Sequence, residues 1–316
     1  MPRDPSPAGV PADDPLLDRF RGALVGVAVG DALGSAFEGM PGPIPTASVD
    51  RHLSAPRRAH FTDDTAMTIA VAESLLHVGG LDLDHLAGTF AASHEREPGR
   101  GYSSATSRLL RDIAAGANWS QRAAAQFRGQ GSLGNGASMR ASPFGLWADE
   151  PRRAGELAGS AATITHTHPL AIDGAAAIAA AVSHAVRHPS GDPAGVLATA
   201  LSVTNTAEMV GRLDDAGALA DAPAAAVADA LGTGITALEA VPAAICCHLH
   251  HPDSLVDTVR FAISLGGDTD TIAAMATAIT GAAVGASAVP LPWAQRCEGV
   301  DHLVELAERI HARRRP

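Results

Sequence analysis

Three glycines spaced four residues apart constrain the fold of this chain more than any other feature. Gly22, Gly26 and Gly30 lie in the apolar stretch LLDRFRGALVGVAVGDALG, residues 16–34. Residues four apart share one face of an α-helix, and a face of glycines has no side chains to hold a neighbour away. The spacing therefore predicts a helix in very close contact with a second helix.

The rest of the sequence also favours helices. Apolar residues recur at helical spacing, and no alternating pattern typical of a strand persists. Hydrophobic residues make up 46% of the chain but aromatic residues only 3%, so the apolar mass is mostly small and aliphatic. We predict an all-α fold with a single compact domain over residues 16–316, preceded by a disordered tail, rich in proline and charge, over residues 1–15.

Charge and cysteine content exclude some classes of protein. The formal net charge is −11, which argues against nucleic-acid binding, because such proteins need basic patches. There are three cysteines, Cys246, Cys247 and Cys297, and the odd number implies no disulfide framework. The N-terminus is not a signal peptide, and the longest apolar runs, near residue 180, are judged too short to span a bilayer. We expect a cytoplasmic protein without membrane contact.

Prolines and glycines divide the helical pattern. Residues 39–60 are predicted to be a loop, and a helix is predicted to start at Asp64 and stop at Gly79 and Gly80. The segment RGQGSLGNGASMR, residues 128–140, holds four glycines within nine residues, typical of a loop whose backbone approaches a ligand closely. Small residues fill another predicted helix at 271–286.

Two short clusters of oxygen-bearing side chains stand at predicted helix starts, some two hundred residues apart. They consist of Thr62, Asp63 and Asp64, and of Asp268, Asp270 and Thr271. Helix capping explains one such residue in each cluster. It does not require two carboxylates, however, and four apposed aspartates would repel one another without a cation. If the clusters meet, they suit a pair of hard divalent cations, which take oxygen ligands.

Four motifs together resemble the ADP-ribosylglycohydrolase family, in order and over residues 18–295. They are FTDDTAM, GSLGNGASMR, ITHTHP and SLGGDTDTIAAMATAITGA. The resemblance implies an all-α fold with a dinuclear metal cleft, which holds two Mg²⁺ or sometimes Mn²⁺. It also implies a monomer that acts on an ADP-ribosylated protein or on a small-molecule ADP-ribose conjugate.

The resemblance implies roles for the acidic residues. The metal ligands would be Thr62, Asp63, Asp64, Asp268, Asp270 and Thr271, with Asp270 bridging the two ions. The catalytic residues would be Glu38, Asp63, Asp64 and Asp270. Glu38 would act as an acid or as a group that gates or orients, with an exposed loop carboxylate as the alternative. Asp31 would hold the loop of the site in place.

The same resemblance implies a binding surface for the substrate. The diphosphate would contact Gly131, Ser132, Leu133, Gly134 and Asn135. Phe127 would stack on adenine, unless it is a core residue, and Ile235 would border the adenine. His166 would lie near the terminal ribose or the phosphates, unless it is structural, and His168 has less support. Gly101 and Tyr102 would line the cleft.

The predicted reaction is hydrolysis of the ribosyl C1″ glycosidic bond with release of ADP-ribose. AQFRGQGSLGNGASMR and GITALEAVPAAICC resemble the branch that acts on serine-linked ADP-ribose, poly(ADP-ribose) and O-acetyl-ADP-ribose. Leu133, GYSS and THTHP depart from that branch and leave ADP-ribosyl-arginine open as the substrate. The other open interpretations are a dinuclear nucleotide phosphohydrolase, a non-catalytic ADP-ribose-binding protein and a structural helical protein.

Overall fold

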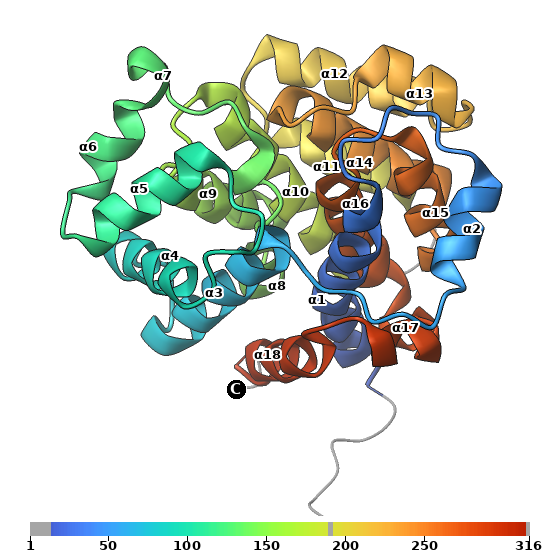
Figure 1. Ribbon diagram of the computed structural model, residues 1–316, viewed down its shortest axis with the longest axis horizontal. Coiled ribbons are helices and arrows are strands. Elements are labelled where there is room, and N and C mark those ends of the chain that lie inside the picture. Colours follow the sequence, from blue (N-terminus) through green and yellow to red (C-terminus); the bar gives the residue numbers. More distant parts are fainter. Residues whose placement is uncertain (1–13, 189–191, 314–316) are drawn as a thin grey trace, which may run out of the picture.

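Helices α1 (Pro15–Gly34) and α16 (Thr269–Val284) lie side by side at the centre of the molecule. Figure 1 shows this pair in the computed structural model, which describes residues 14–188 and 192–313. A Cβ atom at Gly22 would stand 2.2 Å from the carbonyl oxygen of Gly281, and one at Gly26 would stand 2.2 Å from that of Thr277. The close helix contact predicted from the glycine spacing is confirmed.

The described part of the chain contains helices and no β-strand, so the prediction of an all-α domain is confirmed. The remaining helices are α2 (Thr46–Leu53), α3 (Asp63–Val78), α4 (Leu83–Arg96), α5 (Ser104–Ala114), α6 (Trp119–Ala124), α7 (Gln126–Gly129), α8 (Ser142–Trp147), α9 (Pro151–Ala162), α10 (Pro169–Arg187), α11 (Pro193–Ser202), α12 (Ala207–Ala218), α13 (Ala224–Leu231), α14 (Ala237–His250), α15 (Leu255–Leu265), α17 (Leu291–Arg296) and α18 (Val300–Ala312). Short 3₁₀ turns cover Ser35–Phe37, Asn135–Ala137 and Ala286–Ala288.

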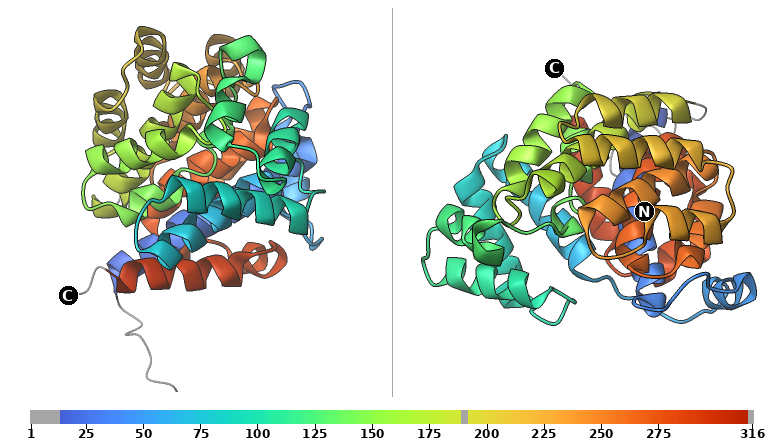
Figure 2. Two further views of the ribbon diagram at one scale, coloured as in Figure 1. Left: turned by 90° about the vertical axis from the view of Figure 1, so that its left-hand side faces the viewer. Right: turned by 90° about the horizontal axis from the view of Figure 1, so that it is seen from above.

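The other helices surround the central pair. Helices α3 to α7 form one side of the molecule, and α2, α15 and α17 form the opposite side (Figure 1). Helix α18 crosses the base, against α1 and α3 (Figure 2). The first and last thirds of the chain are therefore in direct contact.

Within residues 14–188 and 192–313, two helices are long and apolar enough to cross a membrane by length and composition, contrary to the prediction that the apolar runs are too short. They span Pro15–Phe37 and Pro169–Arg187. Within the fold, 83% and 78% of their most apolar windows are buried. Contact with the protein core accounts for their apolar character.

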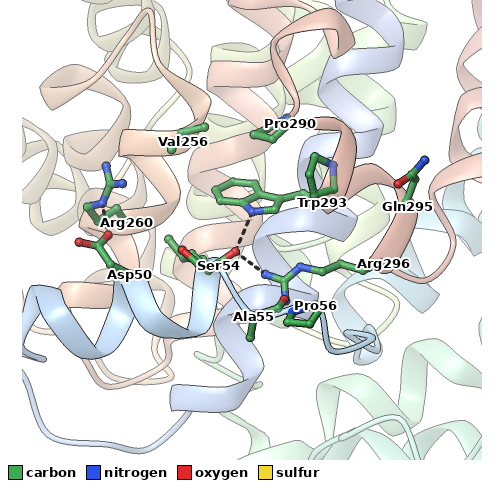
Figure 3. A pocket seen from close by; sticks show the side chains of 12 residues that line it. Asp50, Ser54, Ala55, Pro56, Val256, Arg260, Pro290, Trp293, Gln295 and Arg296 are labelled. Atoms are coloured by element: carbon green, nitrogen blue, oxygen red, sulfur yellow. Dashed lines mark hydrogen bonds and ion pairs between the residues drawn. The ribbon is translucent and has the colours of Figure 1, made fainter.

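The prediction that residues 39–60 form a loop is wrong, because this segment contains α2. Val49 and Leu53, four residues apart, bury their side chains in the core. The end of α2 is held by residues 240 positions away: Trp293 donates its indole N–H to the Leu53 carbonyl at 3.0 Å, and Arg296 donates to the same carbonyl at 2.9 Å (Figure 3). No local pattern reveals such distant partners.

The predicted tail is mostly outside the described residues. Residues 1–13 fall there, while Pro15 opens α1 and Asp14 caps it. The Asp14 carboxylate accepts from the Leu16 and Leu17 amides at 3.1 and 3.2 Å.

Candidate functional site

A buried aspartate from the central helix fixes the start of α3. Asp31 accepts from the backbone amides of Thr62 and Thr65 at 2.9 and 3.0 Å. The hydroxyls of the same two threonines also donate to it, at 2.9 and 2.6 Å. These bonds pin the first oxygen cluster to α1, which is what a residue holding the loop of the site would do.

The two oxygen clusters meet. The Thr271 hydroxyl donates to Asp64 Oδ2 at 3.3 Å from a position 207 residues away. The Thr62 oxygen, whose proton goes to Asp31, lies 3.2 Å from the same Asp64 oxygen. Capping explains only part of this arrangement. Thr62 does cap α3, but Asp268, at the corresponding position of α16, makes no capping bond with its side chain.

The pKa values of three cluster carboxylates, Asp63, Asp64 and Asp270, are raised in the protein without a cation. Burial, and then the charge of Asp268, raises the pKa of Asp270 to about 9. Burial, and then Asp31, raises the pKa of Asp63 to about 7 and that of Asp64 well above its ordinary value. Carboxylates crowded in this way hold either protons or a cation.

The donor set fits a hard divalent cation. One carboxylate oxygen from each of Glu38, Asp268 and Asp270 lies within 4.8 Å of the others, a separation that a single ion can bridge. Asp64 Oδ1 is buried and has no hydrogen-bond partner in the described part of the chain. All the candidate ligand atoms are oxygens, which is the preference of Mg²⁺ and similar ions.

The clusters lie at one wall of a cleft of about 630 Å³. Except for Tyr102, every residue that the sequence predicts for the site lines it: Glu38, Thr62, Asp63, Asp64, Gly101, Phe127, Gly131, Ser132, Leu133, Gly134, Asn135, His166, Ile235, Asp268, Asp270 and Thr271. Segments from both sides of the molecule therefore converge on one cavity.

Tyr102 is the exception, and its predicted place in the cleft wall is corrected. Its side chain turns into the core and packs edge-on against His94, with the ring centroids 4.9 Å apart. Gly101, with a φ of 92°, turns the chain there and leaves only its own backbone at the cleft.

The glycine-rich loop is fixed against the start of α14. Asn135 donates its backbone amide to the Ile235 carbonyl, and Leu133 accepts from the Ala237 amide, both at 3.0 Å. The Asn135 side chain donates one amide N–H to Asp268 Oδ2 at 2.6 Å, so it supports an acidic residue, and its contact with a diphosphate stays a prediction. The backbone amides of Ser132 and Leu133 make no hydrogen bond within the described residues.

Two exposed apolar side chains line the open part of the cleft. Phe127 is 56% exposed, which excludes the alternative that it is a core residue, and Ile235 is 71% exposed. Phe127 has a φ of 49°, in the left-handed region that bulky residues rarely adopt. Apolar rings exposed beside a cavity suit the flat face of a base.

The two histidines differ in role. His166 is 4% exposed, and burial, followed by Arg140, lowers its pKa to about 3, so it is neutral at physiological pH. His168 caps α10, because its Nδ1 accepts from the Leu170 amide at 3.2 Å, although it also borders the cleft.

Several residues that line the cleft were not predicted. They are Met67, Ser103, Ser104, Ala105, Thr106, Gln130, Gly136, Met139, Arg140 and Thr236. Arg140 stands inside a motif singled out from the sequence, and its charge in an apolar surrounding was a usable signal. Ser103 to Thr106 form the start of α5, which only the fold brings to the cleft.

Comparison with known proteins identifies this fold and cleft as those of an ADP-ribosylglycohydrolase, a hydrolase that acts on glycosidic bonds. The model of the ADP-ribosylglycohydrolase family matches residues 12–316, and the chain belongs to this family. Among its relatives, ADP-ribosylhydrolase ARH3 of Danio rerio is 36% identical, over 94% of this chain and 90% of the relative. ADP-ribosylhydrolase ARH3 of Homo sapiens is 34% identical, over 93% of each chain.

A solved structure has the same fold. It is described as an ADP-ribosylglycohydrolase-related protein complex and matches with a TM-score of 0.74 and 26% identity. The match covers 94% of this chain and 98% of the other.

Proposed function

We propose that the protein hydrolyses O-linked ADP-ribosyl groups at the ribosyl C1″ atom and releases intact ADP-ribose, with divalent cations, most simply two Mg²⁺, in the acidic wall of the cleft. One observation carries the proposal: the two oxygen clusters share the Asp64 carboxylate although they are 207 residues apart. The relatives named ADP-ribosylhydrolase ARH3 support the choice of substrate.

The ligands of the cations would be Thr62, Asp63, Asp64, Asp268, Asp270 and Thr271. When bound, such ions supply positive charge that orients hydroxyl groups and makes water a better nucleophile. Asp63 and Asp64 are then placed to accept a proton from the attacking water.

Other residues of the chain would position the substrate and assist the leaving group. Glu38 lies at the cleft, and burial, followed by Asp268, raises the pKa of its carboxyl. It is therefore suited to give a proton to the leaving oxygen. The free amides of Ser132 and Leu133 would bind the diphosphate, and Phe127 and Ile235 would hold the adenine.

The test uses two peptides, one ADP-ribosylated on serine and one on arginine, incubated with the protein and Mg²⁺. Mass spectrometry follows the released nucleotide. We expect intact ADP-ribose from the serine peptide. AMP in its place would overturn the glycosidic mechanism in favour of a phosphohydrolase. Release from the arginine peptide alone would overturn the assignment to O-linked substrates, and binding of ADP-ribose without any release would indicate a binding protein.

A further inference from the structure

A buried arginine stands beside the cleft without an acidic partner. Arg140 is 2% exposed and forms no ion pair within the described residues. Its guanidinium carbon lies 4.3 Å from the centre of the Phe90 ring, and Nη1 contacts the Met67 sulfur at 3.5 Å. Burial of an unpaired cation is costly, so the guanidinium needs hydrogen-bond acceptors from the chain.

That contact is with a threonine that also touches His166. Arg140 Nη2 donates to the Thr165 hydroxyl oxygen at 2.7 Å, and the same oxygen lies 2.6 Å from His166 Nδ1. A guanidinium can only donate, so the threonine oxygen is the acceptor in the first bond. The threonine proton then has a single acceptor within the described residues, His166 Nδ1.

This arrangement fixes the position of the proton on the imidazole. Nδ1 accepts from Thr165 and is unprotonated, so in the neutral ring the proton is on Nε2. The doubly protonated ring is disfavoured, because burial and the charge of Arg140 lower the pKa of His166 to about 3.

The Nε2 atom faces the glycine-rich loop. A Cβ atom would lie 3.3 Å from Nε2 if added at Gly134, and 3.2 Å from it if added at Gly136. Both glycines and His166 line the cleft, and Nε2 has no hydrogen-bond partner in the described chain. A ligand oxygen beside this loop would meet an N–H donor.

We propose that Arg140 is a positioning residue that acts through Thr165 to keep His166 in its Nε2-protonated neutral form, as a hydrogen-bond donor to an anionic oxygen of the ADP-ribose diphosphate. The ligand in this proposal rests on the proposed function, whereas the state of the ring does not. A donor held in this way keeps the same proton over the whole physiological pH range.

The first test is ¹⁵N NMR of protein labelled at its histidines, with His166→Asn to assign the ring. We expect Nδ1 to resonate as an unprotonated nitrogen and Nε2 as a protonated one, without change between pH 8 and pH 5.5. A protonated Nδ1 in the wild-type ring, or a titration near the ordinary histidine pKa, would overturn the proposal.

The second test removes each link. Thr165→Val deletes the hydroxyl at constant shape, and Arg140→Met deletes the cation; both should give a mixture of tautomers. Thr165→Ser should restore the wild-type ring. Thr163→Val is the matched control, because the Thr163 hydroxyl bonds the Ser160 carbonyl and not His166, and it should leave the ring unchanged. If His166 keeps the wild-type tautomer in Thr165→Val, the proposed action of Arg140 through Thr165 is contradicted, even if Arg140→Met does not fold.

Binding of ADP-ribose connects the ring to the substrate. By titration calorimetry, Thr165→Val should raise the Kd about two- to threefold, because only the rings that remain protonated on Nε2 can donate to the ligand. KM should rise by the same factor with kcat nearly constant, because the contact is present before and during the reaction. An unchanged Kd would overturn the ligand assignment. Failure of the wild type to bind ADP-ribose would overturn the proposed function. The NMR result would still show whether Arg140 and Thr165 set the tautomer of His166.

Discussion

Two cavities of similar size differ in how their charges are compensated. The cleft has a volume of about 630 Å³, and a second cavity, between α2, α15 and α17, has about 690 Å³ (Figure 3). In the second cavity, Arg260 pairs with Asp50 at 2.7 Å and also with Asp257. Arg296 donates to four backbone carbonyls around the end of α2.

The charges of the cleft have no such compensation. Its carboxylates contact neutral groups, the Thr62 and Thr271 hydroxyls and the Asn135 amide, and the guanidinium of Arg140 forms no ion pair with them in the described chain. The comparison teaches that volume does not distinguish a functional cavity from a structural one. A functional cavity is distinguished by buried charged groups whose partners must come from a bound ion or ligand.

The largest expected difference between the cavities concerns catalysis. Asp270→Asn removes a carboxylate of the cleft at constant shape and should lower kcat/KM about 10³-fold, the scale for loss of a group that stabilises the transition state. Asp50→Asn, in the second cavity, should change it less than twofold. Both are measured by release of ADP-ribose. Equal losses in the two variants would remove the distinction between the cavities.

The second cavity should matter for stability instead. Arg296→Met removes the four hydrogen bonds that Arg296 donates to backbone carbonyls and leaves those of Ala55 and Arg57 without a donor in the described chain, so the free energy of unfolding should fall by about 3 kcal/mol. Urea denaturation measures this loss, and kcat/KM of the folded fraction should stay within twofold. An Arg296→Met variant that is as stable as the wild type but has a lower kcat/KM would contradict a purely structural role for this cavity.

Divalent cations should act on the cleft alone. Mg²⁺ at a hundred times its Kd should stabilise the fold by about 2.7 kcal/mol, which raises Tm by about 4 °C. Asp63→Asn should abolish this gain, while Arg260→Met should preserve it. A thermal scan with and without EDTA provides the measurement, and a gain that survives in Asp63→Asn would place the ion elsewhere.

The smallest effect is a pH dependence of the cation-free protein. Asp63 and Asp270 have pKa values of about 7 and about 9, above the value of about 3.9 for an unfolded aspartate. The native state then binds more protons, so stability falls as pH rises through this range. In EDTA, Tm should drop by about 3 °C or more between pH 6 and pH 8.5. A Tm that rises over this interval would contradict the raised pKa values.

The sequence predicted the features that follow from local spacing. The glycines of α1 gave the central contact, and the paired Asp and Thr residues marked the two helix starts that meet in the cleft. The sequence missed what depends on distant partners. Helix α2 is held by Trp293 and Arg296, and Arg140 acquires its contact with Thr165 only after folding.

The direction of a side chain was equally beyond the sequence. Gly101 and Tyr102 are adjacent, but one lines the cleft and the other packs on His94. Asn135 was expected to contact a ligand, and the sequence did not reveal that its amide also binds Asp268. A motif places a residue near a site, whereas packing decides which way it points.

The contact between Asp64 and Thr271 has a consequence for synthesis of the chain. A ribosome adds Thr271 only 207 residues after Asp64, because the two residues are that far apart in the sequence. Until then the first cluster lacks its partner, and the nascent protein has only half of a cation site. Under the proposed function, a chain without Thr271 therefore lacks one of the groups that would hold a cation.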